Sequence, residues 1–137
     1  LLINTLAGAL AFARSESILK QKPIVTCQSD NGNECNLSAD WHNGWIIFTD
    51  TNGNKQHDTN EELLRVYSAV ENGTRAKFNR ANHYYYVRYQ PTGRAYPNCT
   101  FLICNPLIGV GKALIVANTG RVRLSSTQAN GSAITCI

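Results

Sequence analysis

Apolar and polar residues recur along this chain with two different periods, and the period changes at Pro23. Residues 1 to about 21 carry apolar side chains three or four positions apart, which predicts one amphipathic helix. This stripe comprises Ile3, Leu6, Ala7, Leu10, Ala13 and Ile18, and Arg14, Glu16, Lys20 and Lys22 lie mostly off it. Proline disfavours helical geometry in the residue before it, so the helix ends ahead of Pro23. We expect no second helix.

After Pro23 the pattern becomes one of short β-type runs separated by turn residues such as Asn-Gly and Pro-Thr-Gly. The predicted strands are residues 24–27, 44–50, 63–68, 76–79, 84–89, 100–104, 113–117, 121–125 and 134–137. One helix followed by antiparallel strands indicates an α+β fold, in which the apolar stripe of the helix packs on a β-sheet. We therefore expect one domain overall, made of a helix over residues 1–22 and a β-rich head over residues 23–137.

Charge is distributed unevenly along the 137 residues. The first 62 residues carry four basic and eight acidic side chains, whereas the remaining residues carry nine basic side chains and one acidic side chain. A basic half of this kind favours a polyanionic partner. Solvated charge spread around a sheet is the alternative interpretation. The composition, 43% apolar and 16% charged, is that of a globular protein.

Five cysteines are present, and none forms a metal-binding CxxC pair. Cys27 and Cys35 bracket a polar loop and are expected to close it with a disulfide in an oxidising compartment. Cys136 lies near the C-terminus, where a disulfide would hold an end that otherwise frays. Its expected partner is Cys104 or Cys99.

Several sequence blocks resemble the GspH/FimT group of type IV pilin-like proteins. The segment from Leu6 to Ile18 is similar to the second half of the long N-terminal helix of that group. Further similar blocks are Pro23-Ile-Val-Thr-Cys27, the run from Trp41 to Asp50 containing Gly-Trp-Ile-Ile-Phe-Thr-Asp, Glu61-Glu-Leu-Leu-Arg65, Cys104-Asn-Pro, and the run from Ala113 to Leu124. Together they cover most of the chain.

The resemblance implies a pilin-like fold, no enzymatic activity and no cofactor. It implies that a hydrophobic helix half precedes this chain and anchors it in the inner membrane, with a periplasmic head that later becomes extracellular in the pilus, near the tip. Other pilins would then be partners. Within the group, Gly-Arg-x-Arg resembles the DNA-binding motif of FimT minor pilins, which act in DNA uptake during natural transformation. Structural minor pilins and type II secretion pseudopilins share the fold without binding DNA, and they define the alternative function.

The matching residues are Gly120, Arg121 and Arg123. Glycine suits the left-handed position of a three-residue hairpin loop. Side chains two apart on a strand share a face, so the two arginines are expected to project together, roughly 6–7 Å apart, while Val122 and Leu124 face the core. Paired guanidiniums bind phosphates well. We expect Lys112, Arg88 and Arg94 to widen this DNA-binding patch, and binding to be independent of base sequence.

Other candidate chemistry is weaker. Residues 50–61 place oxygen donors at several positions of a calcium loop, but Lys55 occupies the position that requires glycine, which favours a plain polar loop. The tyrosine run at residues 84–89 is compatible with stacking on single-stranded DNA, although aromatic residues in strands more often serve packing. Trp41 and Trp45 are expected to pack in the core. The three histidines lack a neighbouring nucleophile motif, so we expect no catalytic site and no metal site.

Overall fold

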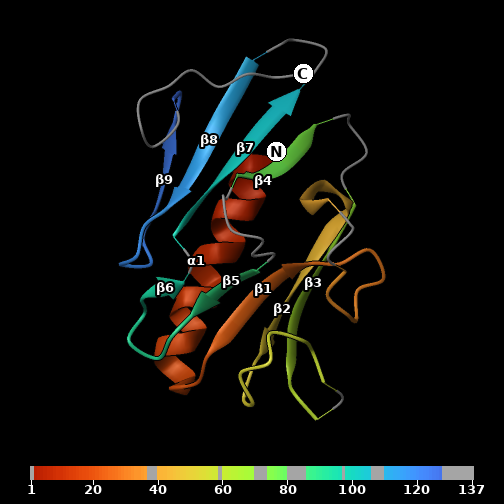
Figure 1. The fold of residues 1–137 in the computed structure, drawn as a ribbon, viewed down its shortest axis with the longest axis vertical. Coiled ribbons are helices and arrows are strands. Elements are labelled where there is room, and N and C mark those ends of the chain that lie inside the picture. The colour runs from red at the N-terminus through yellow and green to blue at the C-terminus, as the bar shows by residue number, and fades with distance from the viewer. Residues whose placement is uncertain are drawn as a thin grey trace.

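The computed structural model describes residues 2–36, 40–58, 60–69, 74–79, 86–96, 98–105 and 110–127. One helix packs against two antiparallel sheets, in agreement with the predicted α+β class (Figure 1). Along the chain the elements are α1 (Leu2–Lys20), β1 (Ile24–Gln28), η1 (Trp41–Asn43), β2 (Gly44–Thr49), β3 (Leu63–Ser68), β4 (Arg75–Asn79), β5 (Tyr86–Tyr89), β6 (Ala95–Tyr96), β7 (Cys99–Asn105), β8 (Val110–Val116) and β9 (Val122–Ser125).

The helix α1 buries one face against the sheets, and the spacing of that face is the one expected from its apolar stripe. Its buried residues are Leu2, Leu6, Ala9, Leu10, Ala13 and Ser17. Ile18 departs from the prediction: its side chain is 41% exposed and packs beside the backbone of Gly93 instead of entering the core. The helix ends at Lys20, ahead of Pro23, as predicted. No helix among the described residues is both long and apolar enough to cross a membrane.

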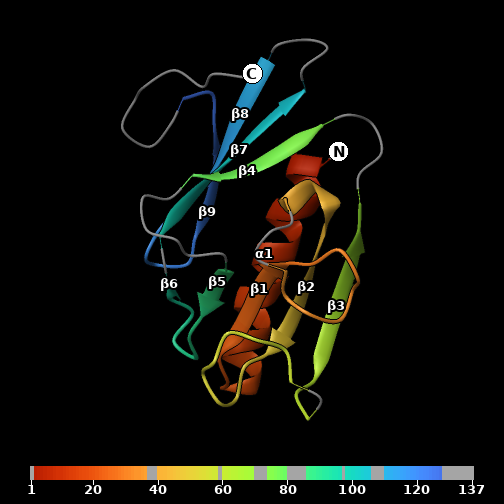
Figure 2. The same ribbon diagram turned by 45° about the vertical axis from the view of Figure 1, so that its right-hand side comes forward.

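Two sheets share the core that α1 covers (Figure 2). The five-stranded sheet has the order β3-β2-β1-β5-β6, and the four-stranded sheet has the order β4-β7-β8-β9. Every residue of the central strand β1 is buried, because one face of the strand meets the main core and the other meets a smaller cluster around Val25, Cys27 and Phe48. In the four-stranded sheet, Phe101, Leu114 and Val116 point into the main core.

Two elements were not expected from the sequence. The strand β6 is only two residues long and is held by pairing with β5, so its own pattern is too short to indicate a strand. The 3-10 turn η1 carries Trp41, whose ring meets Phe101 edge to face at 4.8 Å. Trp45 stacks on Tyr67 in the same core, so the two tryptophans pack as expected. The strand predicted at residues 134–137 lies outside the described residues.

One expected disulfide joins Cys27 to Cys35 across a sequence separation of 8 residues, with the Cα atoms 5.6 Å apart. Cys104 is also disulfide-bonded, whereas Cys99 is a buried thiol. Of the two candidates for the second disulfide, Cys104 is therefore the cysteine that is oxidised. Cys136 lies outside the described residues.

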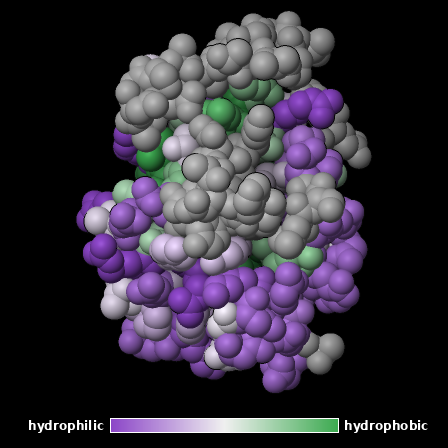
Figure 3. Space-filling view, viewed as in Figure 1, coloured by the Kyte–Doolittle hydropathy of each residue, from purple (hydrophilic) through white to green (hydrophobic). Residues whose placement is uncertain are grey.

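Viewed as in Figure 1, the lower part of the molecule presents a mostly hydrophilic surface, and apolar side chains show in the upper part (Figure 3). The lower part holds the five-stranded sheet and its loops, while the four-stranded sheet lies above (Figure 1). The hairpin with the predicted DNA motif joins β8 to β9 where the two sheets approach each other.

Candidate nucleic-acid interface

The loop between β8 and β9 is a tight hairpin, as the sequence predicts. Ala117 donates its backbone N–H to the carbonyl oxygen of Arg121 at 3.0 Å, and Gly120 donates to the carbonyl oxygen of Ala117 at 2.9 Å. Gly120 has φ +91°, a conformation that side chains with a Cβ rarely adopt. The strand β9 then begins at Val122, so Arg121 is the last residue of the turn and Arg123 lies within the strand.

Gly120 also packs against a turn of the other sheet. A Cβ atom at this position would lie 1.9 Å from the carbonyl oxygen of Gly93, which belongs to the turn between β5 and β6. Next to this contact, Ala95 donates its N–H to the carbonyl oxygen of Asn118 at 3.0 Å. The two sheets thus meet through backbone atoms at this point. The glycine of the Gly-Arg-x-Arg motif is required by the fold.

Arg14 of α1 joins the helix to both turns. Its Nε donates to the carbonyl oxygen of Gly93 at 3.0 Å, and its Nη2 donates to that of Thr119 at 3.4 Å. From the core side, the buried hydroxyl of Tyr89 donates to the carbonyl oxygen of Gly120 at 3.2 Å, and burial raises the pKa of this hydroxyl. Sequence reasoning missed Arg14 because its contacts lie 79 and 105 residues away along the chain.

Three exposed arginines surround this hairpin. Arg121 and Arg123 are both exposed, and exposed Arg94 lies in the β5–β6 turn, one residue before the bond between Ala95 and Asn118. Within the part of the chain that the structure describes, none of the three forms an ion pair with a carboxylate. No described carboxylate oxygen therefore lies within 4.0 Å of these three guanidiniums.

Lys112 lies along β8 away from the hairpin turn, and the side chain of Arg88 is directed to the buried Asp50. Lys112 lies opposite Ile103 in the four-stranded sheet. It precedes Ala117 by five residues, which separates the two by about 17 Å along an extended chain at 3.3–3.4 Å per residue. Arg88 is in the other sheet, where its Nε lies 4.0 Å from Oδ2 of the fully buried Asp50. This ion pair neutralises a buried carboxylate. Neither side chain belongs to the group of three exposed arginines at the hairpin.

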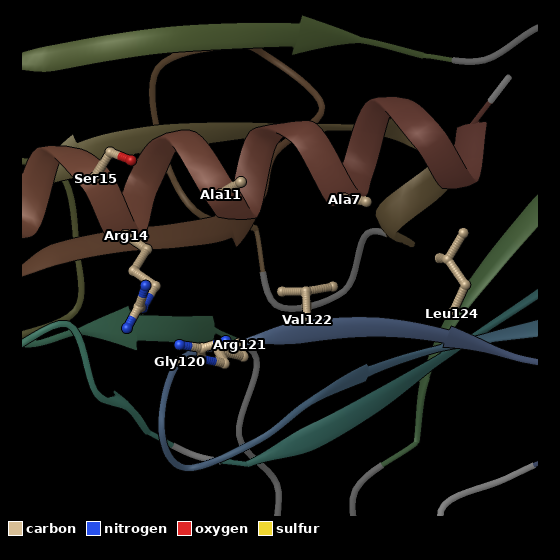
Figure 4. A pocket seen from close by; sticks show the side chains of 8 residues that line it. All are labelled: Ala7, Ala11, Arg14, Ser15, Gly120, Arg121, Val122 and Leu124. Atoms are coloured by element: carbon tan, nitrogen blue, oxygen red, sulfur yellow. The ribbon is translucent and has the colours of Figure 1, made fainter.

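A groove of about 380 Å³ runs between α1 and β9 (Figure 4). It is lined by Ala7, Ala11, Arg14, Ser15, Gly120, Arg121, Val122 and Leu124. Val122 is half-buried against the core, as expected, but Leu124 is 52% exposed, so the prediction that it faces the core is wrong. Leu124 pairs with the buried Leu114, yet it lies on the outermost strand, where no described side chain covers it. Arg121 lines the groove and Arg123 does not.

In the loop considered as a calcium site, two carboxylates accept hydrogen bonds from the backbone of the loop itself. Glu61 accepts hydrogen bonds from the backbone N–H groups of Thr51 at 2.8 Å and Asp58 at 3.0 Å, and Asp50 accepts one from Lys55 at 3.1 Å. Lys55 itself has φ +60°. No group of three potential His, Cys, Asp or Glu ligands gathers among the described residues. These bonds agree with the polar-loop interpretation.

The tyrosines at the end of the predicted run contribute to packing. Tyr89 is fully buried in the main core, and Tyr86 packs against the smaller cluster on the opposite face of the sheet. Neither ring lies at the hairpin surface. Tyr84 and Tyr85 lie outside the described residues.

Comparison with known proteins identifies the family. Residues 2–127 match the family described as type II transport protein GspH. The chain belongs to the GspH family. No curated protein matches it.

Among solved structures, the GspH-family chain is similar to the type IV minor pilin FimU of Pseudomonas aeruginosa in two crystal forms. One has 21% identity and a TM-score of 0.68 over 98% of this chain and 97% of the other. The second has 20% identity and a TM-score of 0.69 over 98% and 92%. The minor pseudopilin EpsH of the Vibrio cholerae type 2 secretion system has 10% identity and a TM-score of 0.60 over 89% and 91%. The chain therefore has the pilin-like fold.

Proposed function

We propose that this GspH-family protein is a minor pilin that holds DNA by its phosphates at the β8–β9 hairpin during DNA uptake. The observation that supports this is the group of Arg94, Arg121 and Arg123, which are exposed around one rigid hairpin and form no ion pair with any described carboxylate. Guanidiniums donate paired hydrogen bonds to phosphate oxygens. The proposal assigns no catalytic activity and no cofactor.

The rigidity of the hairpin makes it suitable for this role. Gly120 is held from three sides by Gly93, Arg14 and Tyr89, so the backbone that carries Arg121 is fixed before DNA arrives. No described element has the form of a recognition helix that could read base edges. Binding should therefore be independent of sequence and sensitive to salt, with affinity near the non-specific range of about 10⁻⁴–10⁻⁶ M.

The fold comparison supports the proposal that the chain assembles into a filament. FimU is a type IV minor pilin and EpsH is a minor pseudopilin of a secretion system. We infer that this chain likewise joins other pilins, with an N-terminal helix half in the inner membrane and a head that reaches the periplasm and then the pilus surface, near the tip. Several weak sites along one DNA molecule would raise the overall avidity.

A structural minor pilin or type II secretion pseudopilin is the second candidate function. It is favoured by the packing of Gly120, because the fold requires this glycine whether or not the protein binds DNA. In that role the hairpin arginines would contact acidic side chains of neighbouring subunits.

Titration with a fluorescein-labelled 30-base-pair duplex at 50 mM salt separates the two candidates. The Arg121→Gln/Arg123→Gln variant is compared with Arg75→Gln/Lys112→Gln, which removes the same charge from exposed positions in β4 and β8. Loss of about tenfold in affinity in the first variant, with little change in the second, supports the DNA-binding function. Absence of binding by the parent protein supports the structural function, and equal losses in both variants would exclude a localised site.

A further inference from the structure

The edge of β9 that pairs with no described strand, together with the groove beside it, forms a second candidate binding surface, which shares only Arg121 with the proposed DNA contact. We propose that the groove between α1 and β9 receives an extended, acidic segment of a partner protein, which pairs with β9 and places a carboxylate at Arg14 and Arg121. This inference goes beyond the proposed DNA contact and does not rest on it.

One side of the β9 backbone pairs with no described strand. Among the described strands, β9 pairs only with β8, with Arg123 opposite Ile115 and Leu124 opposite Leu114. The hydrogen bond from Ala117 to Arg121 shows which residues of β9 bond to β8. Successive residues of an antiparallel strand direct their N–H and C=O groups to opposite sides. Arg121 and Arg123 therefore bond toward β8. Val122 and Leu124 direct their backbone groups to the open edge.

The side chains beside this edge favour an extended polypeptide. Val122 and Leu124 line the groove on the β9 side, while Ala7 and Ala11 line it on the α1 side with side chains of one carbon (Figure 4). An added strand would direct alternate side chains into this space and cover Leu124, which is 52% exposed. An unpaired strand edge presents backbone N–H and C=O groups with which another strand can pair, and Leu124 adds apolar surface beside them.

The charge of the groove lining indicates the chemistry of the partner. Arg14 and Arg121 line one end of the groove, and no acidic side chain is among its lining residues. Arg14 is held in place by the carbonyl oxygens of Gly93 and Thr119, so its guanidinium is preorganised. A carboxylate entering at this end would meet two cations. A nucleotide is less well matched, because no aromatic ring lines the groove to stack on a base.

Nuclear magnetic resonance tests the proposal with the peptide acetyl-Thr-Val-Thr-Val-Thr-Glu-Thr-amide as the probe, in which both valines and the glutamate lie on one face of an extended strand. The expected result is a set of shifts centred on the Val122 and Leu124 amides, with slower hydrogen exchange at both. A peptide with lysine in place of glutamate, and one with proline in place of the central valine, should each bind at least about fivefold more weakly. No shift at either amide, or equal binding by the lysine peptide, would overturn the proposal.

Two single variants separate this surface from the DNA contact. Leu124→Thr should weaken the peptide about fivefold or more and leave DNA affinity within about twofold, since threonine keeps strand propensity but removes apolar surface. Arg123→Gln should weaken DNA binding and leave the peptide affinity within about twofold, because Arg123 does not line the groove. A peptide response that falls with Arg123→Gln and not with Leu124→Thr would mean attraction by general charge, and the proposed groove would be wrong.

Discussion

Replacement of Gly120 by alanine tests whether the motif glycine belongs to the fold. The residue has φ +91°, which costs a residue with a Cβ roughly 1–2 kcal/mol. The new Cβ would lie 1.9 Å from the carbonyl oxygen of Gly93 and 2.7 Å from Nε of Arg14, so the two turns must separate. Separation would weaken the Arg14–Gly93 and Tyr89–Gly120 hydrogen bonds, each worth about 1 kcal/mol. The expected loss is about 3–4 kcal/mol of unfolding free energy.

Urea unfolding measures this loss, and Gly53→Ala is the matched control. Gly53 also has a positive φ, +74°, but a Cβ atom at this position would meet no atom within 4 Å. The control should therefore lose only the conformational cost of about 1–2 kcal/mol. A domain of this size has about 5–15 kcal/mol of stability, so the difference between the variants is measurable. Equal losses in the two variants would refute the packing role of Gly120.

Three further predictions concern the core and the loops. Tyr89→Phe removes the hydrogen bond to the carbonyl oxygen of Gly120 and should cost about 1 kcal/mol in urea unfolding; an unchanged stability would show that this bond contributes nothing. Cys35→Ser opens the disulfide with Cys27 and should cost about 2–3 kcal/mol by thermal or urea unfolding, and a loss below about 1 kcal/mol would contradict this. Burial raises the pKa of the Asp50 carboxyl above its ordinary value of 3.8, so its contribution to stability is fully present below that pH and is lost as pH rises through the folded-state pKa. Asp50→Asn should therefore gain stability relative to the parent as pH rises from about 4 to 7; a constant difference across this range would contradict the inferred pKa shift.

Local periodicity was enough to predict most of the fold. The three-four spacing of the helix and the stop at Pro23 locate α1. Every predicted strand that can be compared begins within about three residues of an observed one, because turn residues separate the short β-type runs. The two-residue strand β6 could not be predicted, since its pairing with β5 and not its own pattern defines it. Ile18 and Leu124 both continue an apolar pattern in the sequence, but they lie beyond the edge of the core and are exposed.

The candidate site was less predictable, because it depends on contacts between distant residues. The hairpin and its glycine follow from local turn chemistry. The sequence holds no sign that Gly120 meets Gly93, that Arg14 bonds to both turns, or that Arg88 neutralises the buried Asp50. The number of arginines in one half of a chain therefore overestimates the size of a binding patch. Some of these cations stabilise the fold, and only the structure separates them from the exposed ones.

The salt dependence of DNA binding tests the central proposal most directly. The logarithm of the association constant for duplex DNA is measured against the logarithm of salt concentration for the parent and for Arg121→Gln/Arg123→Gln. Each phosphate contact contributes about 0.9 to the slope, so loss of two contacts should reduce its magnitude by about 1.8. The same slope and the same affinity in both proteins would contradict the proposal that these two arginines hold DNA.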